Sequence, residues 1–313
     1  MTRRFDHPAM SLSIGLLVML GLAVFLTSPA VADTFSFSTG APDGLLGTAS
    51  RPGPGSGVTV QTETADDFVL TQATSINHAT FTGLLPVGAP LTNITNVEIE
   101  FYHVFPNDSN VARTSGAPTF STSQVPTRVN SPGDVEIASA TRVSGLGGSL
   151  TFTQTILSPN FTVLNTVVNG INIGTPPTFS NVFTGGEGPV TGEEVAVNVT
   201  FTTPVVLSAD HYFFRPEVLL SSGNFLWLSA PRPIVPPGTP FPAGFTDLQS
   251  WIRNDGLAPD WLRIGTDITH QGPFNAVFSL DGQTVPEPST LLLLGSGLAG
   301  VMAWRRKKSL SAK

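Results

Sequence analysis

Hydrophobic and polar residues alternate along several short stretches of this chain. The clearest reads VAVNVTF over residues 195–201, and a second reads VEIEFYH over residues 97–103. A period of two residues places one face of a strand against a core and the other face in water, as in antiparallel sheets. We therefore expect strands at both places, with Glu98 and Glu100 together on a solvated strand face.

Further runs rich in Thr, Val and Phe predict more strands, separated by Gly, Pro and Asn turns. They cover Asp67–Leu70, Ser75–Phe81, Leu150–Ile156, His211–Val218, Phe225–Leu228 and Asn275–Leu280. Residues Asp247–Arg253 are expected to form a short helix, and the proline-rich residues 230–245 a packed surface loop. The pattern indicates an all-β ectodomain, a single jelly-roll-like β-sandwich over residues 58–284, after a flexible Gly/Pro-rich segment at residues 33–57.

Residues 1–32 have the pattern of a secretory signal peptide. Two arginines precede an uncharged apolar run over residues 12–26, which is followed by an A-x-A ending at Ala30 and Ala32. We expect signal peptidase to cleave between Ala32 and Asp33. The alternative is an uncleaved N-terminal anchor, but the run is shorter than the ~20 residues that a membrane-spanning helix needs.

A second apolar run covers residues 290–304 and is followed by four cations, Arg305, Arg306, Lys307 and Lys308. At ~1.5 Å rise per residue such a helix reaches roughly 22 Å, less than the ~30 Å hydrocarbon layer. The cations can reach the interface and act as a stop-transfer cluster on the cytoplasmic side. We therefore expect a marginal span of the inner membrane, with the sandwich outside.

Charge separates the middle of the chain from its ends. Residues 33–284 contain twelve Asp and eight Glu against eight Arg and no Lys, a net charge of 8 − 20 = −12. An acidic domain argues against nucleic acid as a partner, since nucleic acid needs a basic face. The chain has no cysteine. Its sequence therefore excludes thiolate nucleophiles and Cys-ligated metals, and about 250 residues can bury a core without disulfides.

Motifs that carry enzyme chemistry are missing, including G-x-S-x-G, H-E-x-x-H and the P-loop pattern. The histidines are scattered, and His103 and His211 fall in predicted strands, where we expect hydrogen-bonded structural roles. Glu98 and Glu100 have the spacing of a glycosidase pair, yet any solvated strand face gives that spacing too. Asp66–Asp67 could contribute to a Ca²⁺ site, but the usual loop pattern is absent. We expect no catalytic residue, no metal and no cofactor.

Three of the four tryptophans, Trp227, Trp251 and Trp261, fall in one third of the ectodomain. With nearby amide and carboxylate groups they could form a carbohydrate-binding surface, because aromatic faces pack against sugar rings. The other interpretation, which we favour, is that they fill the core or hold the proline-rich loop, since Trp buries a large area.

The segment VPEPSTLLLLGSGLAGVMAWRRKK, residues 285–308, resembles the PEP-CTERM sorting signal of Gram-negative bacteria. The shared parts are a Pro-Glu-Pro triplet, a short Leu/Gly-rich span and a basic cluster, in that order. The resemblance implies that exosortase recognises Pro286, Glu287 and Pro288 and cuts near them. It also makes 290–304 a temporary span in a sorting tail over 285–313. A lasting tail anchor is the alternative.

Parts of the ectodomain, including DDFVLTQATSI and SGNFLWLSAPRPIVPPGTPF, resemble a β-rich domain found in such proteins, for which no activity is known. Proteins with this tail are linked to exopolysaccharide, biofilm or floc formation. The resemblance thus implies an exported, non-enzymatic surface or extracellular-matrix protein, anchored for a time in the inner membrane. A carbohydrate-binding module is one alternative function, and an extracellular hydrolase is another.

Overall fold

The structure is a computed structural model that describes residues 32–53, 61–113, 125–168, 184–286 and 297. The chain divides into two compact units, residues 34–284 and the two ends together. The predicted signal peptide and sorting span lie almost wholly outside the described residues. Within the described part of the chain, no helix has the length and hydropathy to cross a membrane.

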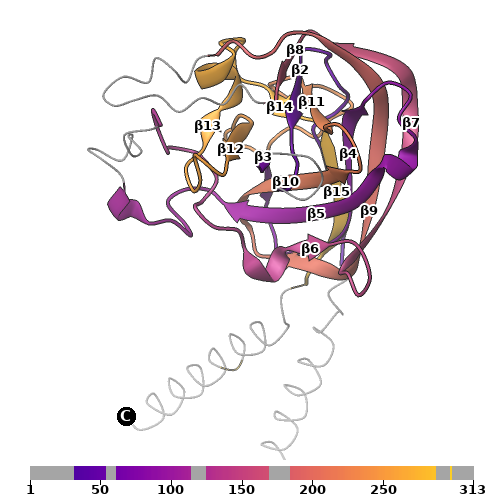
Figure 1. Cartoon of the computed structure of the whole chain (residues 1–313). Helices are drawn as coiled ribbons and strands as arrows, with labels where there is room; N and C mark the ends of the chain where they lie inside the picture. The colour runs from indigo at the N-terminus through magenta and orange to yellow at the C-terminus, as the bar shows by residue number, and fades with distance from the viewer. Residues whose placement is uncertain (1–31, 54–60, 114–124, 169–183, 287–296, 298–313) are drawn as a thin grey trace, which may run out of the picture. The chain divides into compact units, whose positions relative to one another are not determined.

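One sheet of the larger unit has nine strands in the order β1-β15-β4-β11-β2-β8, with β9 beside β4, β7 beside β9, and β14 beside β11 (Figure 1). All pairs are antiparallel except β2 with β8. The strands are β1 (Thr34–Ser38), β2 (Leu46–Ala49), β4 (Thr74–Leu85), β7 (Leu150–Val163), β8 (Asn165–Val167), β9 (Val190–Leu207), β11 (Leu226–Ala230), β14 (Asn275–Ala276) and β15 (Phe278–Thr284).

The second sheet has six antiparallel strands in the order β13-β12-β3-β10-β5-β6. They are β3 (Thr62–Leu70), β5 (Ile94–His103), β6 (Arg142–Val143), β10 (Asp210–Leu220), β12 (Trp251–Asn254) and β13 (Leu262–Arg263). Short helical turns lie in the loops: η1 (Leu91–Asn93), η2 (Val111–Arg113), η3 (Ala138–Ala140) and the π-helical turn η4 (Ile264–Ile268).

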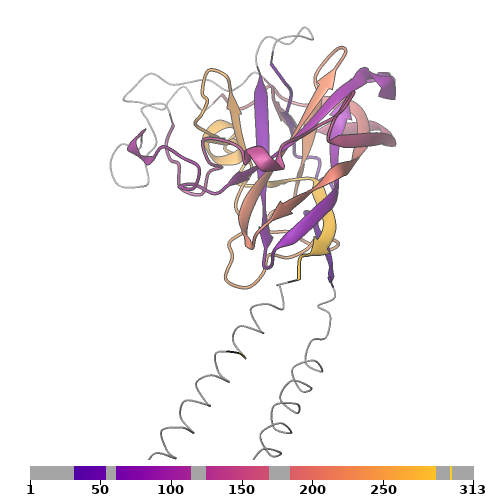
Figure 2. The same ribbon diagram turned by 90° about the horizontal axis from the view of Figure 1, so that it is seen from below.

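The main hydrophobic core lies between the two sheets (Figure 2). It is dominated by aromatic rings from both, and Phe214 of β10 stacks on Phe278 of β15 with ring centroids 4.9 Å apart. The alternating residues of β9 follow the predicted pattern, because Val195, Val197 and Val199 are all buried in this core. The predicted all-β class is confirmed, with two sheets, and each predicted strand overlaps an observed one, although the strand predicted at Asn275–Leu280 is divided between β14 and β15.

A second, smaller core covers the opposite face of the six-stranded sheet. Ala65, Tyr102 and Phe213 from its strands pack there against Trp251 and Trp261. Loops between β5 and β6 and after β12 therefore form an additional layer over this face. Because the six-stranded sheet is covered on both faces, charged residues that point away from the main core are buried too. The candidate site lies among these buried charged residues.

Two local predictions are wrong. The segment expected to be flexible at residues 33–57 contains β1 and the fully buried β2, and Gly44, at φ +73°, makes the turn before β2. The expected helix at 247–253 is extended and ends in β12, because the main-chain N–H of Leu248 and the hydroxyl of Ser250 bond the carboxylates of β3 instead. In both places tertiary bonds decide the conformation.

Candidate functional site

The predicted processing sites flank the sandwich in the sequence. Asp33 is exposed and immediately precedes β1, and β15 ends at Thr284. Thr34 of β1 pairs with Gln283 of β15, so the sandwich begins and ends on neighbouring strands. Of the other predicted processing residues, Ala32 and Pro286 are half-buried, whereas Ala30, Glu287, Pro288 and the cations Arg305, Arg306, Lys307 and Lys308 lie outside the described residues.

The three tryptophans considered for sugar binding are buried. Trp227 is 0% exposed in the main core, and its Nε1 donates to the carbonyl of Val277 at 2.7 Å. Trp251 and Trp261 are 1% and 2% exposed in the outer core. The alternative of a carbohydrate-binding surface formed by these side chains is therefore wrong, since a buried ring offers no face to a sugar, and the favoured interpretation that they fill the core agrees with the structure. Their large area fills both cores instead.

The outer core encloses a cluster of charged side chains around Arg215 of β10. Its Nη2 lies 3.0 Å from Glu63 Oε1 and 3.4 Å from Glu100 Oε2, and its Nη1 lies 3.1 Å from Glu217 Oε2. These residues come from the three adjacent strands β3, β10 and β5. Burial alone would lower the pKa of Arg215, but the carboxylates of Glu63 and Glu217 outweigh it and hold this pKa well above its usual range.

Arg253 of β12 completes the cluster from the loop side. It bonds Glu63, and its Nη2 donates to the hydroxyl of Tyr102 at 3.0 Å. That hydroxyl in turn donates to Glu100 Oε2 at 2.6 Å. The guanidinium also lies 4.3 Å from the ring centroid of Trp261, a cation–π contact. Together the two arginines keep the pKa of Glu63 below its usual range despite burial.

The prediction that Glu98 and Glu100 share a solvated face is wrong. Glu100 is buried and Glu98 is half-buried, because their face of β5 lies beside Arg215 and beneath the loop layer. Burial, followed by a hydrogen bond with Glu100, raises the pKa of Glu98 to about 7. Burial also raises the pKa of Glu217. The carboxylates outnumber the two arginines, and these raised pKa values reduce the excess negative charge.

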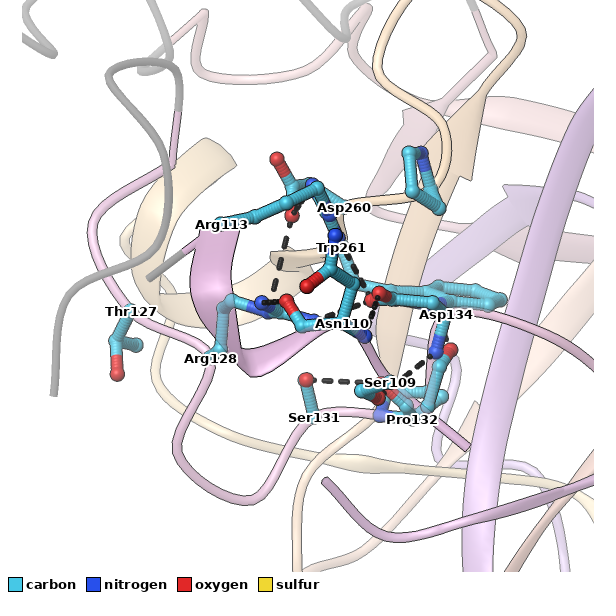
Figure 3. Close-up of polar contacts among 12 residues, drawn as sticks. Ser109, Asn110, Arg113, Thr127, Arg128, Ser131, Pro132, Asp134, Asp260 and Trp261 are labelled. Carbon is cyan, nitrogen blue, oxygen red and sulfur yellow. Dashed lines mark hydrogen bonds and ion pairs between the residues drawn. The ribbon is translucent and has the colours of Figure 1, made fainter. Parts of the chain in front are cut away.

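A second ion-pair network holds the loop layer in place (Figure 3). Arg113 reaches both Asp134, at 2.7 Å, and Asp260, at 2.9 Å, and Arg128 also bonds Asp134. The main-chain N–H of Asn110 donates to the other oxygen of Asp134 at 2.8 Å. Two parts of the β5–β6 loop thereby meet at Asp134, and Arg113 connects them to Asp260 in the loop after β12.

The two networks are connected. The carbonyl of Asp134 accepts from Arg253 Nη1 at 3.0 Å, and Trp261 Nε1 donates to the carbonyl of Gly133 at 3.1 Å. The contacts between the charged cluster and the loops are therefore continuous from β10 out to Arg113. We expect this arrangement to fix the loops on the sheet.

The aspartates considered for Ca²⁺ are buried and hydrogen-bonded. Asp66 accepts from the N–H of Ala276 at 2.8 Å, and Asp67 accepts from His211 Nε2 at 2.6 Å. Burial raises the pKa of both carboxyls. His103 bonds Asp108 at 2.5 Å, so both histidines predicted to be structural are hydrogen-bonded. Among the described side chains, no group of three His, Cys, Asp or Glu is placed to hold a metal.

An open pocket of about 280 Å³ lies on the outer face of the nine-stranded sheet. His78 and Asp281 pair across β4 and β15 at its edge, and His78 Nδ1 lies 3.2 Å from the hydroxyl of Thr200. The rest of its lining comes from β4, β7 and β9: Ala79, Thr80, Thr151, Phe152, Thr153, Asn198 and Val199. The pocket therefore presents hydroxyl, amide and imidazole groups, and no sequence motif indicated it.

Comparison with protein families matches residues 284–307 to the PEP-CTERM protein-sorting motif. No curated protein and no solved structure matches the chain. The matched residues contain the Pro-Glu-Pro triplet, the apolar run and the start of the basic cluster. They support an exported protein that is sorted by exosortase. The chain therefore carries a tail that matches the PEP-CTERM sorting motif, and the match begins where the last strand of the β-rich sandwich ends.

Proposed function

We propose that this chain is a non-enzymatic surface or extracellular-matrix protein, delivered by its tail and associated with exopolysaccharide. Signal peptidase removes residues 1–32, and the tail holds the chain in the inner membrane until exosortase acts. The observation that carries the proposal is the sorting motif at 284–307, which directly follows β15.

The ectodomain supports a structural role over a catalytic one. The carboxylates of the outer core are bonded to buried arginines, as Glu63 and Glu100 are to Arg215. Others are fixed by main-chain N–H groups, as Asp66 is by Ala276. A catalytic pair needs both groups facing a common space that substrate can enter, and these groups face protein atoms.

The proposal is tested by fractionating native-host cells that express the wild type, Glu287→Ala or Glu136→Ala. Glu287→Ala should remain in the membrane fraction at precursor mass, because the triplet loses its only charge. The control removes a half-buried glutamate of the sandwich and should reach the surface like the wild type. Normal release of Glu287→Ala would refute processing through the triplet.

A second candidate function, recognition of a neutral glycan, is favoured by the polar pocket on the nine-stranded sheet. Its hydroxyl and amide groups, including Thr80 bonded to Asn198 at 3.2 Å, match the hydrogen-bonding needs of sugar hydroxyls. Glycan-array binding that is lost in His78→Ala and retained in Thr95→Ala, an exposed change on the other sheet, would support it. No binding by the wild type would refute it.

A further inference from the structure

The strand β7 leaves the longest free edge in the described part of the molecule. The other strands that end a sheet or a branch of it are short: β1 has 5 residues, β8 has 3, and β6, β13 and β14 have 2 each. β7 has 14 residues and pairs only with β9, at the margin of the sheet in Figure 1. Proteins usually protect such edges by shortness, charge or bulges.

The first half of β7 lacks these protections. Residues 150–156 read LTFTQTI and keep an unbroken register with β9, from Leu150 opposite Phe201 to Ile156 opposite Val195. They include no Gly, no Pro and no charged residue. A segment that lacks these residues is prone to pair with another strand. Bulges and Pro159 interrupt the strand only beyond Ile156.

Main-chain groups at this edge are available for pairing. In an edge strand every second residue directs its N–H and C=O away from the sheet. Within the described residues, the main chain of 150–156 bonds only β9. Thr151, Thr153 and Thr155 are exposed, and Ile156 is 44% exposed.

Charge and sequence symmetry indicate which partner fits. The ectodomain carries a net charge of −12, yet no charged residue lies between Arg142 and Glu187. Two copies of this chain therefore repel each other over most surfaces and least at this edge. In an antiparallel pair centred on Thr153, Thr151 of one copy lies opposite Thr155 of the other, and Leu150 lies opposite Ile156.

We propose that residues 150–156 of β7 pair with the same residues of a second copy, in antiparallel register about Thr153, to join two nine-stranded sheets. Such a contact is self-complementary, as two-fold interfaces require. It places threonine opposite threonine on the solvent face and apolar residues opposite apolar residues at both ends of the pairing. The inference goes beyond the proposed function, because it concerns how copies of the ectodomain associate.

The absence of cysteine allows a test of this register in the full-length chain, purified in detergent. Opposed residues of an antiparallel pair have Cα atoms about 4.5–5.5 Å apart, within disulfide range. Thr153→Cys should form a disulfide-linked dimer on mild oxidation. Thr151→Cys alone should not, but mixed with Thr155→Cys it should. Thr200→Cys, exposed on β9 of the same face, is the surface control.

A charge exchange gives an independent measure of the same pairing. Thr153→Lys and Thr153→Glu should each reduce dimer more than tenfold in sedimentation experiments, because like charges oppose each other. A mixture of the two should restore it. The proposal is overturned if Thr153→Cys stays monomeric, if the Thr200→Cys control cross-links equally, or if the Lys and Glu variants associate like the wild type.

Discussion

The sorting tail and the sandwich of this protein carry information of different kinds. The tail at 284–307 matches a known motif through a triplet, an apolar run and cations in fixed order. The sandwich at 34–284 has a defined fold, and no curated protein or solved structure matches it. A short signal is read directly from its residues, whereas a fold is compatible with many functions. The tail therefore indicates how the protein is sorted, whereas the molecular activity of the sandwich is a proposal.

The two regions should also respond differently to substitution. In the sandwich, charge is buried and stabilises the packing of loops on a sheet. In the tail, the single acidic residue between 283 and 304 is expected to serve recognition. Changes to the first should alter folding, and changes to the second should alter sorting.

The largest effect is expected for Arg215→Met. It removes the cation shared by Glu63, Glu100 and Glu217 and leaves Arg253 as the remaining arginine for these buried carboxylates, which costs about 3–5 kcal/mol. Urea titration of the variant and the wild type measures this loss as a difference in the free energy of unfolding.

Arg263→Met is the control. Arg263 is 26% exposed and pairs with Asp267, so its loss should cost under about 1 kcal/mol. Equal losses in the two variants would show that the Arg215 cluster contributes no more than the single, partly exposed pair of Arg263 and Asp267.

A smaller loss is expected for Asp134→Asn. This change keeps the shape of the side chain but removes the charge that Arg113 and Arg128 share, at a cost of about 1–3 kcal/mol. Hydrogen exchange should increase first in the loops around residues 108–113. If exchange increases uniformly over the sandwich instead, Asp134 does not act as the local attachment point of these loops.

Stability should depend on pH through Glu98. Its pKa is about 7 in the folded chain and near 4.5 when unfolded, so between these values the folded state binds more protons. The free energy of unfolding therefore falls as pH rises from about 4.5 to 7. The raised pKa values of Asp66, Asp67 and Glu217 act in the same direction, and the lowered value of Glu63 opposes them.

Glu98→Gln separates this contribution from the others. The variant should lose less stability than the wild type between pH 5 and pH 8, as measured by thermal unfolding at each pH. Identical pH slopes for the two proteins would contradict a raised pKa at Glu98.

The smallest effect on folding is expected for Glu287→Ala. The residue follows the last strand by three positions and should change the free energy of unfolding by less than ~0.5 kcal/mol. A loss above 1 kcal/mol would mean that the tail contributes to the sandwich, and the two regions would no longer be independent.

The sequence predicts the all-β class and most of the long strands, because alternation such as that of Val195–Phe201 depends only on one buried face. It does not reveal the outer core. Glu98 and Glu100 alternate with apolar residues whether their face meets water or Arg215, so the binary pattern is the same in both cases. Finding the cluster requires the register that places Arg215 opposite Glu100, which is a property of the folded sheet.

The intact mass of the mature protein, isolated from wild-type native cells, tests the central claim most directly. We expect a chain that begins at Asp33 and lacks residues 291–304, because both processing steps have occurred. A mature chain that still carries residues 291–304 would contradict the account and would make the tail a lasting membrane anchor.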